Sequence, residues 1–213
     1  MHCFSPLLIG ALLLVSCGNQ PKNSNAQTDA ESVATGPLFD PADLPQEPLF
    51  DIATSLGTMR VKLYKETPLH RDNFVKLAAA RYYDGIIFHR VIKGFMIQAG
   101  ETGDSPTPIQ LAYGDQTGVN YTIPAEIVPG FTHKRGTLAT ARLGDPVNPE
   151  KASSGSQFYI VHTDDGARHL DGNYTIFGEV VDGFEIIDTI ANTAVSGSRP
   201  TQEVKIVSII PVL

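Results

Sequence analysis

The chain has 213 residues, a hydrophobic fraction of 42% and a formal net charge of −7. The length predicts one domain with extensions, and the composition is that of an ordinary globular protein. The acidic balance argues against a nucleic-acid partner, because phosphate is bound by clustered lysines and arginines and these are scattered here. Cys3 and Cys17 are the two cysteines, so the rest of the chain must fold without a disulfide.

The N-terminus has the pattern of an export signal. Residues 1–16 contain no Lys, Arg, Asp or Glu, and residues 7–15 form an apolar run. This run is too short for a transmembrane helix but typical of a signal peptide. It ends in the letters LVSC, which resemble a bacterial lipobox, where the cysteine is lipidated and becomes the first mature residue. We expect residues 1–16 to be a lipoprotein signal peptide and Cys17 to carry lipid; an ordinary secretory signal is the alternative.

Residues 17–47 are predicted to be the lipidated cysteine and a disordered tether. Residues 18–36 are polar, rich in Asn, Ser, Ala and Gln, and have little to bury. Residues 37–48 contain four prolines, which favour an extended chain. The folded domain is therefore expected over residues 48–213.

Regular patterning begins near Pro48. Residues 49–64 alternate as two strands around a turn, and residues 66–80 predict a helix with Thr67 as N-cap and Pro68 in its first position. The further elements expected are a strand at 86–92 ended by Gly94, a polar loop at 100–120, strands at 137–142, 157–162 and 174–181, a helix at 183–193 and a closing strand at 203–212. Two helices among about eight strands predict a mainly β fold, an antiparallel barrel or sandwich with helical covers.

Arg90 points to chemistry, because it lies inside an apolar strand. An arginine keeps its charge, and burying it unpaired costs several kcal/mol. The sequence contains no Gly-x-Ser-x-Gly elbow, phosphate-binding glycine loop or His-Glu-x-x-His zinc pattern. A reaction that needs no covalent chemistry would suit such a residue. A structural salt bridge at Arg90 and a metal hydrolase built on the histidines are the alternatives.

Rotation about an X–Pro peptide bond is one such reaction. Its barrier of about 18–20 kcal/mol comes from amide resonance. Twisting localises a lone pair on the prolyl nitrogen, so a donor aimed there stabilises the twisted state more than either planar state. Composition alone does not select this reaction.

Five ordered motifs resemble the cyclophilin family of peptidyl-prolyl isomerases. They are FHRVIKGFMIQAG (88–100), GTLATAR (136–142), SSGSQFYIV (153–161), HLDGNYTIFGEVVDG (169–183) and the closing strand. The resemblance covers residues 48–213. It implies an eight-stranded antiparallel barrel capped by two α-helices, no cofactor or metal, a monomer, and proline-containing unfolded or flexible polypeptides as substrates. Residues 144–155 are longer than in compact members, and we expect a surface excursion there.

By position in these motifs, Arg90 matches the catalytic arginine. The resemblance implies substrate contacts from Phe95, Met96, Gln98, Ala141, Arg142, Gln157, Tyr159, His169, Leu170 and Tyr174. Three of these depart from the family: Tyr159 replaces phenylalanine, Tyr174 replaces histidine, and His169 replaces the tryptophan with which vertebrate members bind cyclosporin. The hydroxyl of Tyr159 would need a partner in an apolar pocket.

Two functions of different class remain. The first is an isomerase for X–Pro bonds in exported proteins, lipid-anchored in a bacterial cell envelope and facing the periplasm. The second is a catalytically weak cyclophilin-like module that binds proline segments as a chaperone. The intact Arg90, Phe95, Met96 and Gln98 favour the first. Tyr159, Tyr174 and the unusual loop at 101–120 leave room for the second.

Overall fold

A computed structural model of the protein describes residues 37–101 and 121–212. These residues belong to one compact unit that begins at Thr35. The predicted signal peptide, Cys17, the tether as far as residue 36 and most of the predicted 100–120 loop lie outside the described residues. Within the described ranges, no helix has the length and apolar character needed to cross a membrane.

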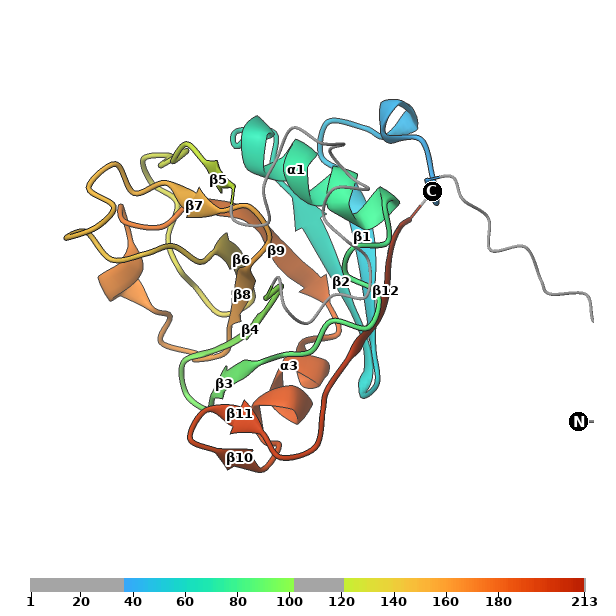
Figure 1. Ribbon diagram of the computed structural model, residues 1–213, viewed down its shortest axis with the longest axis vertical. Helices are drawn as coiled ribbons and strands as arrows, with labels where there is room; N and C mark the ends of the chain where they lie inside the picture. Colours follow the sequence, from blue (N-terminus) through green and yellow to red (C-terminus); the bar gives the residue numbers. More distant parts are fainter. Residues whose placement is uncertain (1–36, 102–120, 213) are drawn as a thin grey trace, which may run out of the picture. The chain divides into compact units, whose positions relative to one another are not determined.

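Eight strands form one antiparallel sheet in the order β12-β1-β2-β9-β6-β8-β4-β3 (Figure 1). The sheet curls until the segments beside its two edge strands meet: the Phe88 N–H donates to the Val204 carbonyl at 2.9 Å, and the Ile206 N–H donates to the Ile86 carbonyl at 2.8 Å. The strands are β1 Leu49–Thr54, β2 Gly57–Leu63, β3 Arg90–Ile92, β4 Met96–Ala99, β6 Thr137–Thr140, β8 Phe158–Val161, β9 Ile176–Asp182 and β12 Ile206–Pro211.

Within the described residues two α-helices accompany this sheet, α1 at Pro68–Ala79 and α3 at Phe184–Ala191. Figure 1 shows them at opposite ends of the strands, with α1 contacting β9 and β12 and α3 contacting β2, β3 and β4. The mainly β prediction with eight antiparallel strands and two helices is therefore confirmed. The sequence did not predict the shorter elements, which are η1 Pro41–Asp43, η4 Arg168–Leu170 and two small sheets pairing β5 Thr122–Ile123 with β7 Ser153–Ser154 and β10 Val195–Ser196 with β11 Arg199–Pro200.

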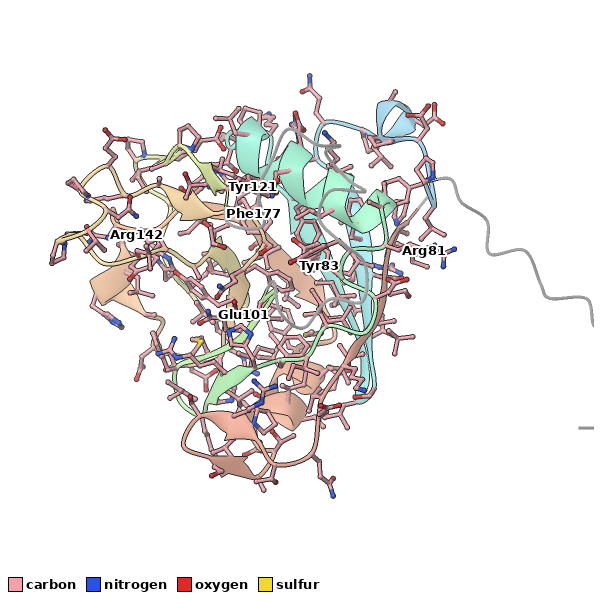
Figure 2. All side chains as sticks on the ribbon, in the orientation of Figure 1. Arg81, Tyr83, Glu101, Tyr121, Arg142 and Phe177 are labelled. Atoms are coloured by element: carbon pink, nitrogen blue, oxygen red, sulfur yellow. The ribbon has the colours of Figure 1, made fainter. Side chains whose placement is uncertain are left out.

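Phe74 on α1 anchors the helix to the interior of the curled sheet. Its ring centroid lies between 5.2 and 6.1 Å from the rings of Phe50, Tyr83, Phe158 and Phe177. Figure 2 shows Tyr83 and Phe177 beneath α1. Offset and edge-on aromatic pairs of this kind stabilise a core beyond their buried area.

The strand predicted at 86–92 is shorter in the structure, where β3 spans only Arg90–Ile92. The preceding residues 86–88 pair instead with the segment that leads into β12, through the bridge between Ile87 and Lys205. Their apolar side chains are buried because they lie at the seam where the sheet closes. Periodicity alone could not separate these two pairings.

The folded unit also begins earlier than the predicted Pro48. The Leu38 N–H donates to the carbonyl of Ala79 at the end of α1 at 2.8 Å, and the Phe39 ring lies 5.7 Å from the ring of Phe50. A backbone hydrogen bond and one aromatic contact thus fix a segment whose prolines suggested a continued tether.

Helix α1 begins as predicted with Pro68 in its first position, but its cap comes from elsewhere. Thr67 occupies the N-cap position and its hydroxyl makes no capping bond. The Glu126 carboxylate accepts instead from the backbone N–H groups of Leu69 and His70, at 3.1 and 3.0 Å, and its Oε2 lies 2.7 Å from Nδ1 of His70. A carboxylate is favourable there because the first N–H groups of a helix lack partners and carry partial positive charge.

We expect Glu126→Ala to lower the free energy of unfolding by about 1–2 kcal/mol, because it removes the cap of α1. Glu126→Gln keeps one acceptor oxygen and should lose less. Urea denaturation at neutral pH measures both, with Glu150→Gln as a control on an exposed loop. Equal stability of Glu126→Ala and the parent would contradict this assignment.

Candidate active site

Three predicted site residues stand side by side on adjacent strands. Arg90 of β3 lies opposite Gln98 of β4, and Gln98 lies opposite Tyr159 of β8. Tyr159 in turn lies opposite Ala139 of β6. Directly opposed residues in a sheet project to the same face, so this row aligns a cation, an amide, a phenol and a methyl group.

The pleat explains why these strands are apolar on both faces. On β4 and β8, Ile97, Phe158 and Ile160 point into the main core. The alternating residues Met96 and Tyr159 belong to a second apolar cluster on the opposite face. That second face forms the site.

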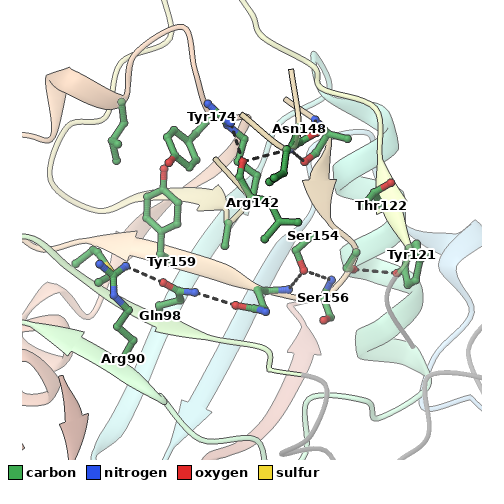
Figure 3. A pocket seen from close by; sticks show the side chains of 18 of the residues that line it. Arg90, Gln98, Tyr121, Thr122, Arg142, Asn148, Ser154, Ser156, Tyr159 and Tyr174 are labelled. Atoms are coloured by element: carbon green, nitrogen blue, oxygen red, sulfur yellow. Dashed lines mark hydrogen bonds between the residues drawn. The ribbon is translucent and has the colours of Figure 1, made fainter. Parts of the chain in front are cut away.

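A cavity of about 870 Å³ opens over this face (Figure 3). Ten of the eleven predicted catalytic or substrate-binding residues line it, namely Arg90, Phe95, Met96, Gln98, Ala141, Arg142, Gln157, Tyr159, Leu170 and Tyr174. His169 does not line it; its ring is exposed and lies 5.5 Å from the ring of Phe95. We call the apolar part of the cavity, formed by Phe95, Met96, Tyr159 and Leu170, the proline pocket.

Arg90 is held by an amide, not by a carboxylate. Its Nη1 donates to Oε1 of Gln98 at 3.1 Å, and Nε2 of Gln98 donates to Oε1 of Gln157 at 2.9 Å (Figure 3). Within residues 37–101 and 121–212, no carboxylate lies within 4.0 Å of its guanidinium nitrogens, so the described part gives the salt-bridge alternative no support. The guanidinium also lies 6.0 Å from the centre of the Phe95 ring. It therefore keeps its charge at the edge of an apolar surface.

The hydroxyl of Tyr159 has the partner that the sequence required. It lies 2.9 Å from Nε2 of His133, whose Nδ1 lies 2.8 Å from Oδ1 of Asp171. Burial lowers the pKa of His133 against the opposing effect of Asp171, so the imidazole is neutral. With the proton on Nδ1 directed at the carboxylate, Nε2 accepts from the tyrosine hydroxyl. Burial also raises the pKa of Tyr159 well above its usual value, which keeps that hydroxyl protonated.

Arg142 forms another wall of the cavity together with Tyr174. Its guanidinium carbon lies 4.6 Å from the centre of the Tyr174 ring, its Nε donates to the Asn173 carbonyl at 2.6 Å, and its Nη2 pairs with Asp145 at 2.7 Å. The side chain is 4% exposed. Its charge thus stabilises the wall through contacts with protein groups.

The predicted surface excursion at 144–155 contributes to the cavity as well. Leu143 and Val147 are 68% and 73% exposed, and both line it. Asn148 fixes the turn, because its Nδ2 donates to the Ala152 carbonyl at 2.8 Å and its Oδ1 accepts from the Ala152 N–H at 3.0 Å. The sequence did not predict that this excursion borders the site.

The buried histidines pair singly with carboxylates. His70 contacts Glu126 and His133 contacts Asp171. No group of three potential metal-binding side chains from His, Cys, Asp and Glu occurs in the described ranges. The arrangement that remains is a cation and amide donors beside an apolar pocket.

Comparison with known proteins agrees with this geometry. The model of the family described as cyclophilin type peptidyl-prolyl cis-trans isomerase matches residues 49–210. The chain belongs to this family. As a cyclophilin-type peptidyl-prolyl cis-trans isomerase, the protein is an enzyme, and the predicted family and activity are confirmed.

Relatives come from distant organisms. The peptidyl-prolyl cis-trans isomerase CYP18-1 of Arabidopsis thaliana is 39% identical over 159 residues, which are 72% of this chain and 89% of that protein. A peptidyl-prolyl isomerase of Acinetobacter baylyi is 32% identical over 192 residues, 84% of this chain and 93% of that protein.

Solved structures extend the likeness to the fold. The crystal structure of a Cryptosporidium parvum cyclophilin has a TM-score of 0.65 and 30% identity, and it covers 78% of this chain and 98% of that one. A structure of the same protein in the presence of the dipeptide Ala-Pro has a TM-score of 0.64.

The partners of Tyr159 behind the pocket, His133 and Asp171, were not found from the sequence. The requirement of Tyr159 for a hydrogen-bond partner was the available signal. It could not select one histidine, because His133 precedes Tyr159 by 26 positions and lies outside the regular elements.

We expect the free energy of unfolding to fall as the pH drops from about 6.5 to about 5. Burial lowers the pKa values of both His70 and His133 below 6.5, so the unfolded chain binds more protons in this range than the folded chain does. Urea midpoints at several pH values measure this. The exposed His169→Gln variant should keep the same slope, and a midpoint that is constant or rises on acidification would contradict the prediction.

Proposed function

We propose that this cyclophilin accelerates rotation about X–Pro bonds in exported polypeptides, with Arg90 as the catalytic residue. The observation that carries this is the position of Arg90: a cation beside an apolar cavity, oriented by Gln98 and without a carboxylate partner among the described residues. Such a group can donate to the prolyl nitrogen when twisting localises its lone pair. A charged hydrogen bond contributes about 1.5–3 kcal/mol, or roughly one to two powers of ten in rate.

The proline pocket supplies the second contribution. This pocket presents the rings and methyl groups of Phe95, Met96, Tyr159 and Leu170 beside Arg90. These groups would bind the pyrrolidine ring of the substrate and exclude water from the peptide bond. Removing water strengthens the hydrogen bond to the prolyl nitrogen and reduces the solvation of the planar amide. Proline-containing unfolded or flexible segments are the substrates that fit this site.

The site of action in this proposal is a bacterial cell envelope. The apolar run at 7–15 and the letters LVSC support lipidation at Cys17. Residues 18–36 would then separate the lipid from the folded unit, whose described residues begin at Pro37. The folded unit contains no cysteine, so an oxidising periplasm would not affect it.

We expect Arg90→Ala to lower kcat/KM for a short X–Pro peptide by about 10- to 100-fold while the protein stays folded. Isomerisation by the fragment 36–213 measures this. Arg60→Ala is the matched control, because Arg60 is a partly exposed arginine of β2 that pairs with Asp51 and does not line the cavity.

The outcomes separate the two candidate functions. If the parent fragment accelerates isomerisation and Arg90→Ala loses most of the activity, Arg90 acts on the twisted bond. If the parent fragment binds the peptide without accelerating rotation, the protein is a binding module for proline segments. Unchanged activity of Arg90→Ala would remove the proposed role.

We expect Cys17→Ser to move the full-length protein from the membrane to the soluble fraction, because lipid at this sulfur is the proposed anchor. Cys3→Ser is the matched control and should leave the distribution unchanged. Fractionation of a bacterial host followed by immunoblotting measures both. Membrane association of Cys17→Ser equal to that of the parent would exclude this anchor.

A further inference from the structure

A buried polar chain lies behind the proline pocket, and bond rotation by Arg90 does not require it. It runs from the Tyr159 hydroxyl to Nε2 of His133 at 2.9 Å and from Nδ1 of His133 to Oδ1 of Asp171 at 2.8 Å. His133 is fully buried, whereas Tyr159 lines the cavity. These hydrogen bonds therefore link the Tyr159 ring, which lines the cavity, to the buried imidazole of His133.

Asp171 fixes the imidazole in two ways. Its Oδ1 accepts from the ring nitrogen and also from the backbone N–H of His133, at 2.8 Å in each case. Burial would raise the pKa of Asp171, but these hydrogen bonds lower it, so the carboxylate stays charged. The backbone and the ring of His133 thus share one acceptor, which sets both the ring orientation and the tautomer.

The imidazole in turn sets the position of the Tyr159 ring. The two rings are nearly parallel, with an interplanar angle of 11°, and Tyr174 packs edge-on against both. The tyrosine is 4% exposed, and its surroundings are the apolar side chains of Met96, Val161 and their neighbours. A buried hydroxyl without an acceptor is costly, so the ring would shift if Nε2 of His133 ceased to accept.

We propose that His133, oriented by Asp171, is a positioning residue that holds the ring of Tyr159 as the wall against which the substrate proline packs. His133 does not touch substrate and acts through Tyr159. The inference rests on the proposed use of the proline pocket. The hydrogen bonds from Asp171 through His133 to Tyr159 would thus affect how tightly substrate binds, and not the rate of bond rotation.

Protonation of His133 then weakens substrate binding. A proton on Nε2 turns the acceptor into a donor, and the Tyr159 hydroxyl loses the group that receives its hydrogen. The titratable and charged groups around the pair are Asp171 on the Nδ1 side, Tyr174 at the ring edges, His169, and Arg142 and Arg168, which act on Tyr159 and Asp171. Among the described groups, Asp171 is the one placed to receive a proton from Nδ1.

A double-mutant cycle tests the proposal on the full-length protein. In the parent background, His133→Leu should raise KM for an X–Pro peptide at least 5-fold and change kcat by less than 2-fold. The same change should raise KM less than 2-fold in the Tyr159→Phe background, where no hydroxyl needs an acceptor. Equal effects in the two backgrounds, or no effect in the parent, would overturn the proposal.

A second variant keeps the test decisive if His133→Leu does not fold. His133→Gln can still accept from the Tyr159 hydroxyl through Oε1 but does not titrate. The parent KM should rise at least 3-fold between pH 7.5 and pH 5.5, whereas the His133→Gln value should change less than the parent value. The two proteins differ only at residue 133, so the difference between their profiles isolates His133, and identical profiles would overturn the proposal.

Peptide dissociation constants, measured in parallel by fluorescence anisotropy, separate this inference from the proposed catalysis. If the parent binds peptide without accelerating isomerisation, the proposed function of Arg90 fails, and the same cycle and pH profile in Kd still decide the role of His133. Circular dichroism at each pH ensures that only folded protein is compared.

Discussion

The site depends on one constraint, which is that β4 and β8 are buried on both faces. Their inward residues complete the core of the curled sheet, and their outward residues Met96 and Tyr159 contribute to the proline pocket. Because side chains alternate along a strand, a slip of one residue would exchange Met96 for Ile97 on the pocket face and move Gln98 away from Arg90. The core packing of Ile97, Phe158 and Ile160 therefore also fixes the positions of the polar groups outside it.

The spacing of the motifs allowed much of the site to be predicted. Met96 and Gln98 are two positions apart on one strand, so alternation alone places them on the same face, and Tyr159 follows from the register of the neighbouring strand. The likeness to cyclophilins supplied the expected fold and the remaining site residues. The predicted residues that line the cavity together are those whose positions follow from local periodicity and a shared motif.

The features that were missed come from contacts between distant positions. Glu126 caps α1 from 56 residues away from His70, and Asp171 reaches His133 across 38 residues. Neither lies in a segment with a periodic pattern that could predict where its side chain would be. The seam at 86–88 was missed for a related reason, since an apolar run reveals burial but not the partner strand.

The hydrogen bonds between Arg90, Gln98 and Gln157 have a direction, and the guanidinium determines it. An arginine has no acceptor, so Gln98 must turn its oxygen toward Arg90 and its amino group toward the oxygen of Gln157. Within the described residues, the amino group of Gln157 has no acceptor. The hydrogen-bonded series of Arg90, Gln98 and Gln157 therefore presents N–H groups to the cavity at both of its ends. A surface of this polarity is complementary to carbonyl oxygens and a prolyl nitrogen, and a peptide backbone at proline offers these acceptors without a competing N–H of its own.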